Sequence, residues 1–360
     1  MAIANLDLES IIKGIQPLDV DWVKKAEERT AQLIMPTRAL GRLHDISEKL
    51  CAIQKTLEPA VDRKAFLVMA GDHGVVKEGV SAYPQEVTAE MIKAFLAGGA
   101  GINVLARQVG AEIIVVDMGI IAELNLSSLP GGHQLIIRKV ANGTANLARG
   151  PAMSKTQAQQ AILTGFTLAC DLMTRGVQIL GTGDMGIGNT TPSAAIGAVF
   201  TGSSLEDMVG RGTGVDDPGL QRKRAAIESG IQINQPEPGD GLDVLAKMGG
   251  FEIGGIAGCI LAGAYHKHPV VIDGFISTAG ALIAHALCPS VTDYLFAGHC
   301  SEEPGHKLML NYLGLKPILD LGMRLGEGTG AALAMGIMDG AVRIFRDMLT
   351  FEEAGVSNKD

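Results

Sequence analysis

The chain has 360 residues, of which 47% are hydrophobic and 19% are charged. This balance is typical of a globular protein and excludes a disordered chain. The net charge of −9, with no extended run of Lys or Arg, argues against a protein that binds nucleic acid through general electrostatics.

The five cysteines are odd in number and form no CxxC pair, so we expect neither a zinc ribbon nor a disulfide framework. Scattered reduced cysteines, and an N-terminus without the basic-then-apolar pattern of a signal peptide, favour a cytoplasmic protein. The longest uncharged apolar stretches, residues 253–265 and 276–288, have only about 13 residues, whereas a bilayer requires about 20. We therefore expect buried helices and no membrane span.

The first 60 residues carry apolar side chains at helical spacing and predict helices. From about residue 64, short apolar runs alternate with longer helical stretches, and each run ends in a turn containing Gly or Asp. The runs lie at residues 65–70, 113–116, 177–180, 270–272 and 294–297.

Continuous apolar runs separated by helices predict an α/β protein with a parallel sheet covered on both faces. In such a sheet the loops that follow the strands lie along one edge, where ligands bind. We therefore expect these five loops to share one site. Residues 330–351 predict an amphipathic C-terminal helix with Leu333, Ile337, Ala341 and Phe345 on one face.

The loop at residues 181–192 is the richest in glycine, and it follows a predicted strand and precedes a helix of small residues. Glycines allow backbone N–H groups to approach an anion, and a helix N-terminus favours negative charge. No Lys follows the glycines, which excludes a P-loop. Gly181, Gly183 and Gly186 match GxGxxG, but Glu206 does not follow a clear second strand, so dinucleotide binding is weakly supported. A tight structural turn remains the alternative.

Lys223 lies within Arg-Lys-Arg at residues 222–224, where we expect the basic first turn of a helix. A lysine ammonium suits a phosphate. A solvated surface lysine is the favoured interpretation from the residues alone.

Two segments contain candidate ligands or acid–base groups. In residues 298–306, Ser301 could bind phosphate, or His299, Glu302 and His306 could bind a metal, although their spacing matches no usual pattern. Asp72 and His73 could form an acid–base or metal pair, but neighbours on an extended turn point in different directions.

Glu327 stands between two glycines immediately before an apolar helix. Burial would raise the pKa of its carboxyl group toward a value useful for a base, whereas the helix dipole would lower that pKa. The residues alone leave open which effect is larger, and a first-turn Glu that only complements the dipole is the alternative.

Seven segments, taken together in this order, resemble the nicotinate-nucleotide–dimethylbenzimidazole phosphoribosyltransferases of cobalamin biosynthesis. The resemblance covers residues 10 to 350. The segments are AGDHGV at 70–75, YPQEVT at 83–88, GIGNTTP at 186–192, GRGTG at 210–214, IDGFIS at 272–277, GHCSEEPGH at 298–306 and RLGEGTGAALA at 324–334.

The resemblance implies that phosphoribose moves from nicotinate mononucleotide to 5,6-dimethylbenzimidazole. The products would be nicotinate and α-ribazole 5'-phosphate, used for the nucleotide loop of cobalamin. Glu327 matches the family's catalytic glutamate and would be the general base. The reaction requires no cofactor and no metal, because the pyridinium of the nucleotide is already a good leaving group.

Other roles follow from the resemblance by position. Lys223, Ser301 and the backbone at Gly186 and Gly274 would contact the nucleotide phosphate. The base pocket would be lined by Tyr83, Met91 and Leu325. Asp184 would lie near nicotinate or ribose, at a position where the family commonly has the longer Glu.

The resemblance also implies a homodimer and two domains. The larger, Rossmann-like α/β domain would span residues 61–329. A smaller helical domain would combine residues 1–60 and 330–360 from the two ends of the chain.

Two other hypotheses remain open from the residues. A nucleotide phosphatase or N-ribosyl hydrolase would use Asp72 and His73 to activate water, and would release nicotinate without an acceptor base. A regulatory protein would bind nicotinate mononucleotide without turnover.

Overall fold

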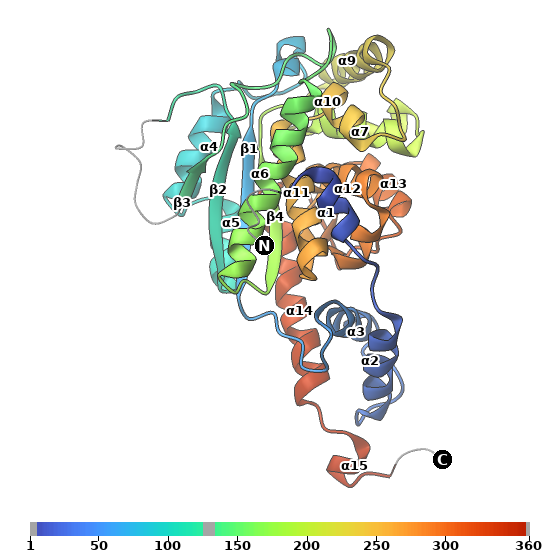
Figure 1. Ribbon diagram of the computed structural model, residues 1–360. Helices are drawn as coiled ribbons and strands as arrows, with labels where there is room; N and C mark the ends of the chain where they lie inside the picture. The colour runs from blue at the N-terminus through green and yellow to red at the C-terminus, as the bar shows by residue number, and fades with distance from the viewer. Residues whose placement is uncertain (1–5, 125–133, 358–360) are drawn as a thin grey trace.

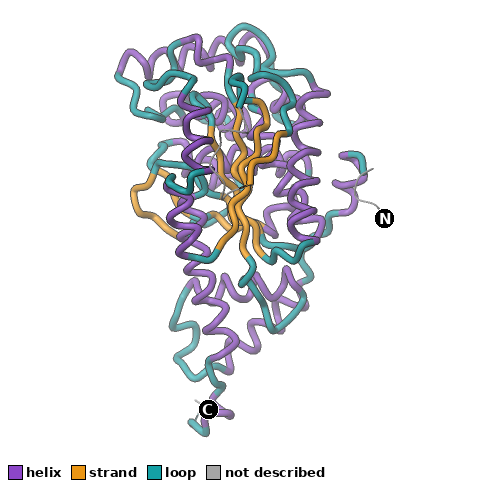
Figure 2. The backbone as a smooth tube through the Cα atoms, turned by 90° about the vertical axis from the view of Figure 1, so that its left-hand side faces the viewer, coloured by secondary structure: helices purple, strands orange, loops and turns teal. Residues whose placement is uncertain are grey.

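A computed structural model describes residues 6–124 and 134–357 of the protein. The protein is built around a six-stranded parallel sheet (Figures 1 and 2). The strand order is β3-β2-β1-β4-β5-β6, and every neighbouring pair is parallel. The strands are β1 (Lys64–Gly71), β2 (Ala111–Gly119), β3 (Gln134–Ile137), β4 (Ile179–Met185), β5 (Val270–Ile272) and β6 (Leu295–Ala297).

The five strands expected from the sequence are confirmed, and with them the α/β class. The sixth, β3, was missed because it is a four-residue edge strand with no fully buried position. Its half-exposed side chains lack the continuous apolar run that marks an interior strand.

Helices cover both faces of the sheet. The helices α11 and α12 pack on one face, with α6 against α11, whereas α4, α5 and α14 pack on the other. Figure 1 shows these layers, with α6 and α11 on the opposite side of the sheet from α4 and α5. The helices of these layers are α4 (Val87–Leu96), α5 (Gly101–Gln108), α6 (Lys155–Thr174), α11 (Phe251–His266), α12 (Phe275–Leu287) and α14 (Thr329–Asp347).

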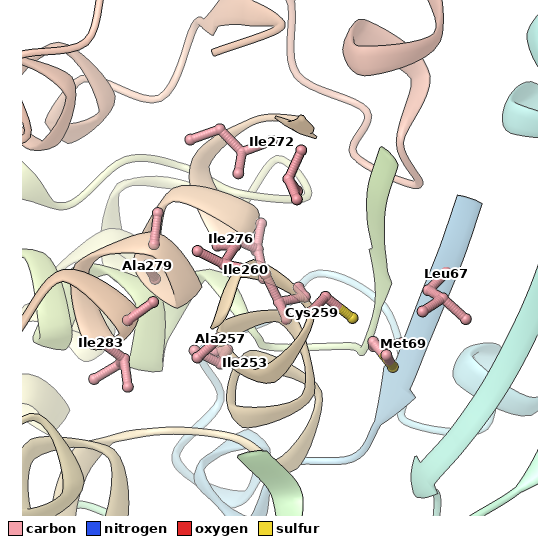
Figure 3. Close-up of a cluster of buried hydrophobic side chains, with 14 of the residues drawn as sticks. Leu67, Met69, Ile253, Ala257, Cys259, Ile260, Ile272, Ile276, Ala279 and Ile283 are labelled. Atoms are coloured by element: carbon pink, nitrogen blue, oxygen red, sulfur yellow. The ribbon is translucent and has the colours of Figure 1, made fainter. Parts of the chain in front are cut away.

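The core extends over both faces of the sheet, and a large part of it lies between the sheet and α11 and α12. Figure 3 shows Met69 of β1 near Cys259 of α11, and Ile276 of α12 beside Ile260. The uncharged stretches 253–265 and 276–288 are therefore largely buried helices, as expected. Their glycines permit close packing, since a Cβ at Gly258 would overlap the backbone carbonyl of Ile162.

The described residues also form further α-helices and a small second sheet. Strand β7 pairs in parallel with β8. These elements are α1 (Leu8–Gly14), α2 (Val20–Gln32), α3 (Arg42–Gln54), α7 (Thr190–Thr201), α8 (Leu205–Met208), α9 (Asp217–Asn234), α10 (Gly241–Met248), β7 (His299–Ser301), α13 (Gly305–Tyr312), β8 (Leu319–Met323) and α15 (Phe351–Ala354).

The chain ends come together, because α14 packs against α3, which in turn packs against α2. The expected C-terminal helix exists, but it ends at Asp347 and its buried face differs from the predicted one. Ala341 and Phe345 are buried as expected, whereas Ile337 is exposed and Met338 is buried in its place. The face that packs on the sheet and on α3 is therefore rotated by about one residue from the expected stripe.

One stretch, Val87–Gln108, has the length and composition of a helix that could cross a membrane. In the structure it is two helices, α4 and α5, separated by a turn in which Gly98 is left-handed with φ 75°. Both helices pack on the sheet through buried side chains such as Phe95 and Ile102. The stretch thus contributes to the interior of the fold.

The strand order reverses direction between β1 and β4, since β2 and β3 lie on one side of β1 and β5 and β6 follow β4 on the other. Connections on the two sides run to opposite faces, which opens a crevice at the carboxyl ends of these strands. This crevice is the expected place for a ligand.

Candidate active site

A cavity of about 690 Å³ opens at the carboxyl ends of β4 and β5. It is closed on other sides by the start of α4, by β7 and by the turn that precedes α14. Eight of the nine predicted site residues line it: Tyr83, Met91, Asp184, Gly186, Gly274, Ser301, Leu325 and Glu327.

Glu327 lies in an unusual turn of three consecutive residues with positive φ. The φ values are 84° at Gly326, 65° at Glu327 and 105° at Gly328. A non-glycine residue in this region costs on the order of 1 kcal/mol or more, so surrounding contacts must hold it there. The glycines of the Gly-Glu-Gly motif are needed for this turn, which presents the Glu327 side chain to the cavity.

The carboxylate of Glu327 reaches the N-terminus of α5, where its Oε2 accepts a hydrogen bond from the Ile102 N–H at 3.0 Å. Only 5% of the residue is exposed. Burial raises the pKa of Glu327, and this effect exceeds the lowering by the Ile102 N–H. Burial therefore has the larger effect on the pKa of Glu327, a point that the sequence left open. The helix whose N-terminus contacts the carboxylate is α5.

Asp184 ends β4 and is also buried. Its Oδ2 accepts a hydrogen bond from Asn189 Nδ2 at 3.0 Å. Burial, followed by the charge of Asp273, raises the pKa of Asp184 to about 8. At neutral pH this carboxyl group is therefore mainly protonated and can donate a hydrogen bond.

Lys223 is buried, so the surface interpretation favoured by the sequence is wrong. Its Nζ donates to Thr190 Oγ1 at 2.8 Å and to the Gly210 carbonyl at 3.0 Å. Burial lowers the pKa of Lys223 to about 8, and nearby Glu303 opposes this. Lys223 does not itself line the cavity wall, but its partner Thr190 does.

The position of Lys223 within its helix also differs from expectation. Helix α9 begins at Asp217, and the side chain of Asp216 caps it by accepting from the Gly219 N–H at 2.8 Å. The first turn is therefore acidic, and Lys223 lies a turn later, on the buried face.

A hydrogen-bonded network fixes Ser301 and the backbone at Gly274. The Ser301 N–H donates to His306 Nδ1 at 2.8 Å, so the ring proton is on Nε2, which lies 2.8 Å from Thr278 Oγ1. The Thr278 hydroxyl donates to the Gly274 carbonyl at 2.8 Å. Burial lowers the pKa of His306 to about 3, which keeps the ring neutral.

This network accounts for both nitrogens of His306 and does not include Glu302. Within residues 6–124 and 134–357, no group of three or more His, Cys, Asp and Glu side chains is arranged to hold a metal ion. His299, Glu302 and His306 are therefore not arranged as a three-residue metal site in the part of the chain that the structure describes.

Asp72 and His73 point to different partners. Asp72 Oδ2 accepts from the Ile121 N–H at 2.7 Å, whereas His73 Nε2 lies 2.8 Å from Glu252 Oε1 on α11. Neither side chain lines the cavity. Asp72 thus stabilises a turn, and the two residues do not act as a pair.

Tyr83 and Leu325 form an open, apolar rim of the cavity. Tyr83 is 54% exposed and Leu325 is 61% exposed, and Met91 lies on the same wall. Large exposed apolar side chains at the mouth of a pocket are typical of a surface that a ligand covers.

Several cavity residues were missed by the sequence analysis. Asn189 and Thr190 lie in the glycine-rich loop already singled out, and Glu303 follows the predicted Ser301, so their motifs carried a signal. Asp273, which does not line the cavity but accepts a hydrogen bond from the Gly328 N–H beside Glu327, was visible only as the polar residue after a predicted strand. The Ile102 N–H, a backbone donor, leaves no signal in the sequence.

The glycine-rich loops, the buried acids and the buried lysine meet at the switch point of a doubly wound sheet. Fold and site together define an α/β enzyme that binds its ligands at the carboxyl edge of the strands.

Comparison with known proteins specifies the family. A phosphoribosyltransferase family model matches residues 15–356. The nicotinate-nucleotide–dimethylbenzimidazole phosphoribosyltransferase of Geobacter metallireducens is 51% identical over 349 residues, which are 97% of this chain and 98% of that protein. The protein of the same name from Roseiflexus sp. is 53% identical over 352 residues, 98% of each chain.

A crystal structure of the enzyme of that name from Thermus thermophilus superposes with a TM-score of 0.88. It is 46% identical in sequence, and the alignment covers 95% of this chain and all of that one. The chain belongs to the nicotinate-nucleotide–dimethylbenzimidazole phosphoribosyltransferase family.

Proposed function

We propose that this protein transfers phosphoribose from nicotinate mononucleotide to 5,6-dimethylbenzimidazole, with Glu327 as the general base. The observation that carries the role of Glu327 is its buried carboxyl group in the cavity wall, where burial raises its pKa. The reaction gives nicotinate and α-ribazole 5'-phosphate for the cobalamin nucleotide loop.

The chemistry balances with one proton transfer. Glu327 takes the N–H proton of the benzimidazole, and the other ring nitrogen attacks the anomeric carbon opposite the pyridinium. The bond from that carbon to the pyridinium nitrogen breaks, and its electron pair stays on the nitrogen, which gives neutral pyridine in nicotinate. Attack from the opposite face inverts the configuration from β to α.

A raised pKa makes the Glu327 carboxylate a stronger base, which favours proton removal at neutral pH. Its anchored Oε2 fixes the side chain, since the Ile102 N–H holds that oxygen. Binding holds the attacking benzimidazole nitrogen, the anomeric carbon and the pyridinium in line. Part of the entropic cost of the reaction is then met by binding, which makes a large contribution to the rate.

Lys223, Ser301 and the backbone at Gly186 and Gly274 are proposed to bind the nucleotide phosphate. The ammonium of Lys223, next to Thr190 at the cavity wall, supplies positive charge to a dianion. Asp184 is proposed to face the nicotinate or ribose as a hydrogen-bond donor, because its carboxyl group is mainly protonated at neutral pH.

The aromatic base is proposed to bind against Tyr83, Met91 and Leu325. The protein is further proposed to act in the cytoplasm as a homodimer. Its smaller domain would be formed by residues 1–60 and 330–360, and its larger domain by residues 61–329; the packing of α14 against α3 supports this division.

The test is nicotinate release from nicotinate mononucleotide, with and without dimethylbenzimidazole, for the wild type and Glu327→Gln. We expect release that requires the base, yields α-ribazole 5'-phosphate and falls by about two orders of magnitude or more in the variant. Release without the base would instead identify a hydrolase. A variant with wild-type activity would remove Glu327 from the general-base role.

A further inference from the structure

Asp273 follows β5 directly and is completely buried. Its Oδ1 accepts hydrogen bonds from the N–H groups of Gly330 at 2.7 Å and Ala331 at 3.0 Å. Its Oδ2 accepts from the Gly328 N–H at 3.1 Å. One carboxylate thus binds three backbone donors in the four residues that follow Glu327.

These N–H groups have no acceptor within α14, because the first N–H groups of a helix are never satisfied by the helix itself. Without Asp273 they would lose these hydrogen bonds. The N-cap residue, Gly328, has no side chain to cap them. The cap comes instead from a different strand of the sheet. Asp273 therefore fixes the start of α14 relative to β5, and with it the turn that carries Glu327.

The turn needs such a restraint. Glu327 has φ 65°, which is costly for a residue with a side chain and persists only where neighbouring contacts determine it. The Gly328 N–H bond to Asp273 holds the backbone on one side of Glu327, and the Ile102 N–H holds its carboxylate. Glu327 is thereby fixed both at its backbone and at the end of its side chain.

We propose that Asp273 is a positioning residue for the transfer reaction: by binding the N–H groups of Gly328, Gly330 and Ala331, it holds Glu327 where it can accept the proton of the base. This inference rests on the proposed function and adds to it a residue that contacts neither substrate.

Asp273 lies among several other titratable and charged side chains near Glu327. Asp184 reaches the cavity from β4, and His299 of β7 places its Nε2 3.7 Å from Asp273 Oδ1. Arg324 lines the same cavity three residues before Glu327, and the charge of Glu252 on α11 contributes to the raised pKa of Asp184. The negative charge of Asp273 raises the pKa of Glu327, in addition to the larger effect of burial.

Asp273→Asn tests this role selectively. With its amide oxygen in the Oδ1 position, Asn still accepts from Gly330 and Ala331, but its NH₂ group meets the Gly328 N–H and cannot accept that bond. The start of α14 stays capped while the restraint next to Glu327 is lost. Asp117→Asn is the matched control, because Asp117 is also buried, near the end of β2, and accepts from the Gly119 and Ile120 N–H groups, at 3.0 and 2.9 Å.

The measurements are kcat and KM across pH, with unfolding temperature as the check on folding. For Asp273→Asn we expect kcat to fall about tenfold to a hundredfold, with a smaller change in KM, because the Glu327 carboxylate is misplaced by a fraction of an ångström or more. The acidic limb of the kcat profile should move to lower pH, since loss of the nearby negative charge lowers the pKa of Glu327. Hydrogen exchange in the peptide spanning residues 325–332 should become faster. None of these changes is expected in Asp117→Asn.

Wild-type kcat in folded Asp273→Asn would overturn the proposal. So would a loss of activity with an unmoved acidic limb and unchanged exchange at residues 325–332, because that result would show only a general structural defect. Failure of the proposed function is separate, since it would appear as absence of transfer in the wild type or full activity in Glu327→Gln.

Discussion

Gly183 of β4 packs directly against the backbone carbonyl of Glu327. A Cβ at position 183 would overlap that oxygen, and it would also lie close to Val68 Cγ2. The second glycine of the 181–186 motif therefore leaves room for the turn that carries Glu327.

We expect Gly183→Ala to displace Glu327 and to lower kcat by about a hundredfold, the scale that misplacement of a reacting group by about 1 Å can reach. The overlap should also lower the free energy of unfolding by about 1–3 kcal/mol. Steady-state kinetics and urea unfolding measure the two effects. The control is Gly340→Ala in α14, where a Cβ would meet no atom within 4 Å, and this variant should keep its activity. Unchanged kcat in Gly183→Ala would show that the turn adjusts without cost to the reaction.

Asp184→Asn should stabilise the protein increasingly as the pH rises. The pKa of Asp184 is about 8 in the folded protein, against an ordinary value of 3.8. Between these values the folded state holds a proton that the unfolded chain has lost, so the contribution of this group to stability falls with increasing pH. The fall is on the order of 1 kcal/mol per pH unit, and Asn, which does not ionise, removes it.

Urea unfolding at pH 5 and pH 7.5 measures this difference. The stability gain of Asp184→Asn over the wild type should be clearly larger at pH 7.5. Glu206→Gln, at an exposed acid on α8, serves as the control and should keep the wild-type pH dependence. An equal gain at both pH values would mean that Asp184 is ionised across this range.

Binding of nicotinate mononucleotide should weaken above about pH 8. Burial lowers the pKa of Lys223 to about 8, so its ammonium loses its proton and its charge as the pH rises through this value. The kcat/KM for nicotinate mononucleotide, which reports on the free enzyme, should therefore decline on the basic side with an apparent pKa near 8.

Lys223→Met should lower this kcat/KM by about tenfold to a hundredfold, the usual effect of losing a hydrogen bond to a charged group. The variant should also lose the decline near pH 8. A decline that persists in Lys223→Met would assign it to another group.

Leu325→Ala should weaken binding of the aromatic base with little effect on the nucleotide. The Leu325 side chain is 61% exposed at the cavity rim. A bound aromatic base would cover this apolar surface, which would contribute about 1–2 kcal/mol to the free energy of binding. We expect KM for dimethylbenzimidazole to rise about tenfold while kcat is nearly unchanged. Ile337→Ala, at another exposed apolar residue on α14, is the control. Unchanged KM for the base would place the aromatic ring elsewhere in the cavity.

The sequence by itself determined the class of fold, and it predicted eight residues that line the cavity. Apolar runs ending in Gly or Asp located five of the six strands of the main sheet, because a strand that is buried on both faces must be continuously apolar. The same pattern placed Asp184, Gly274 and Ser301 at one edge of the sheet. It missed β3, since an edge strand with half-exposed side chains carries no such run.

Only the tertiary structure decided the states of the charged groups. Lys223 looks like a surface lysine in its basic segment, but contacts with Thr190 and Gly210, distant along the chain, bury it and lower its pKa. The pKa of Glu327 likewise depends on burial and on an N–H group 225 residues away. Desolvation and hydrogen bonding act through space, so a linear pattern can nominate an acid or a base, whereas the packing of distant segments determines whether it can perform that role.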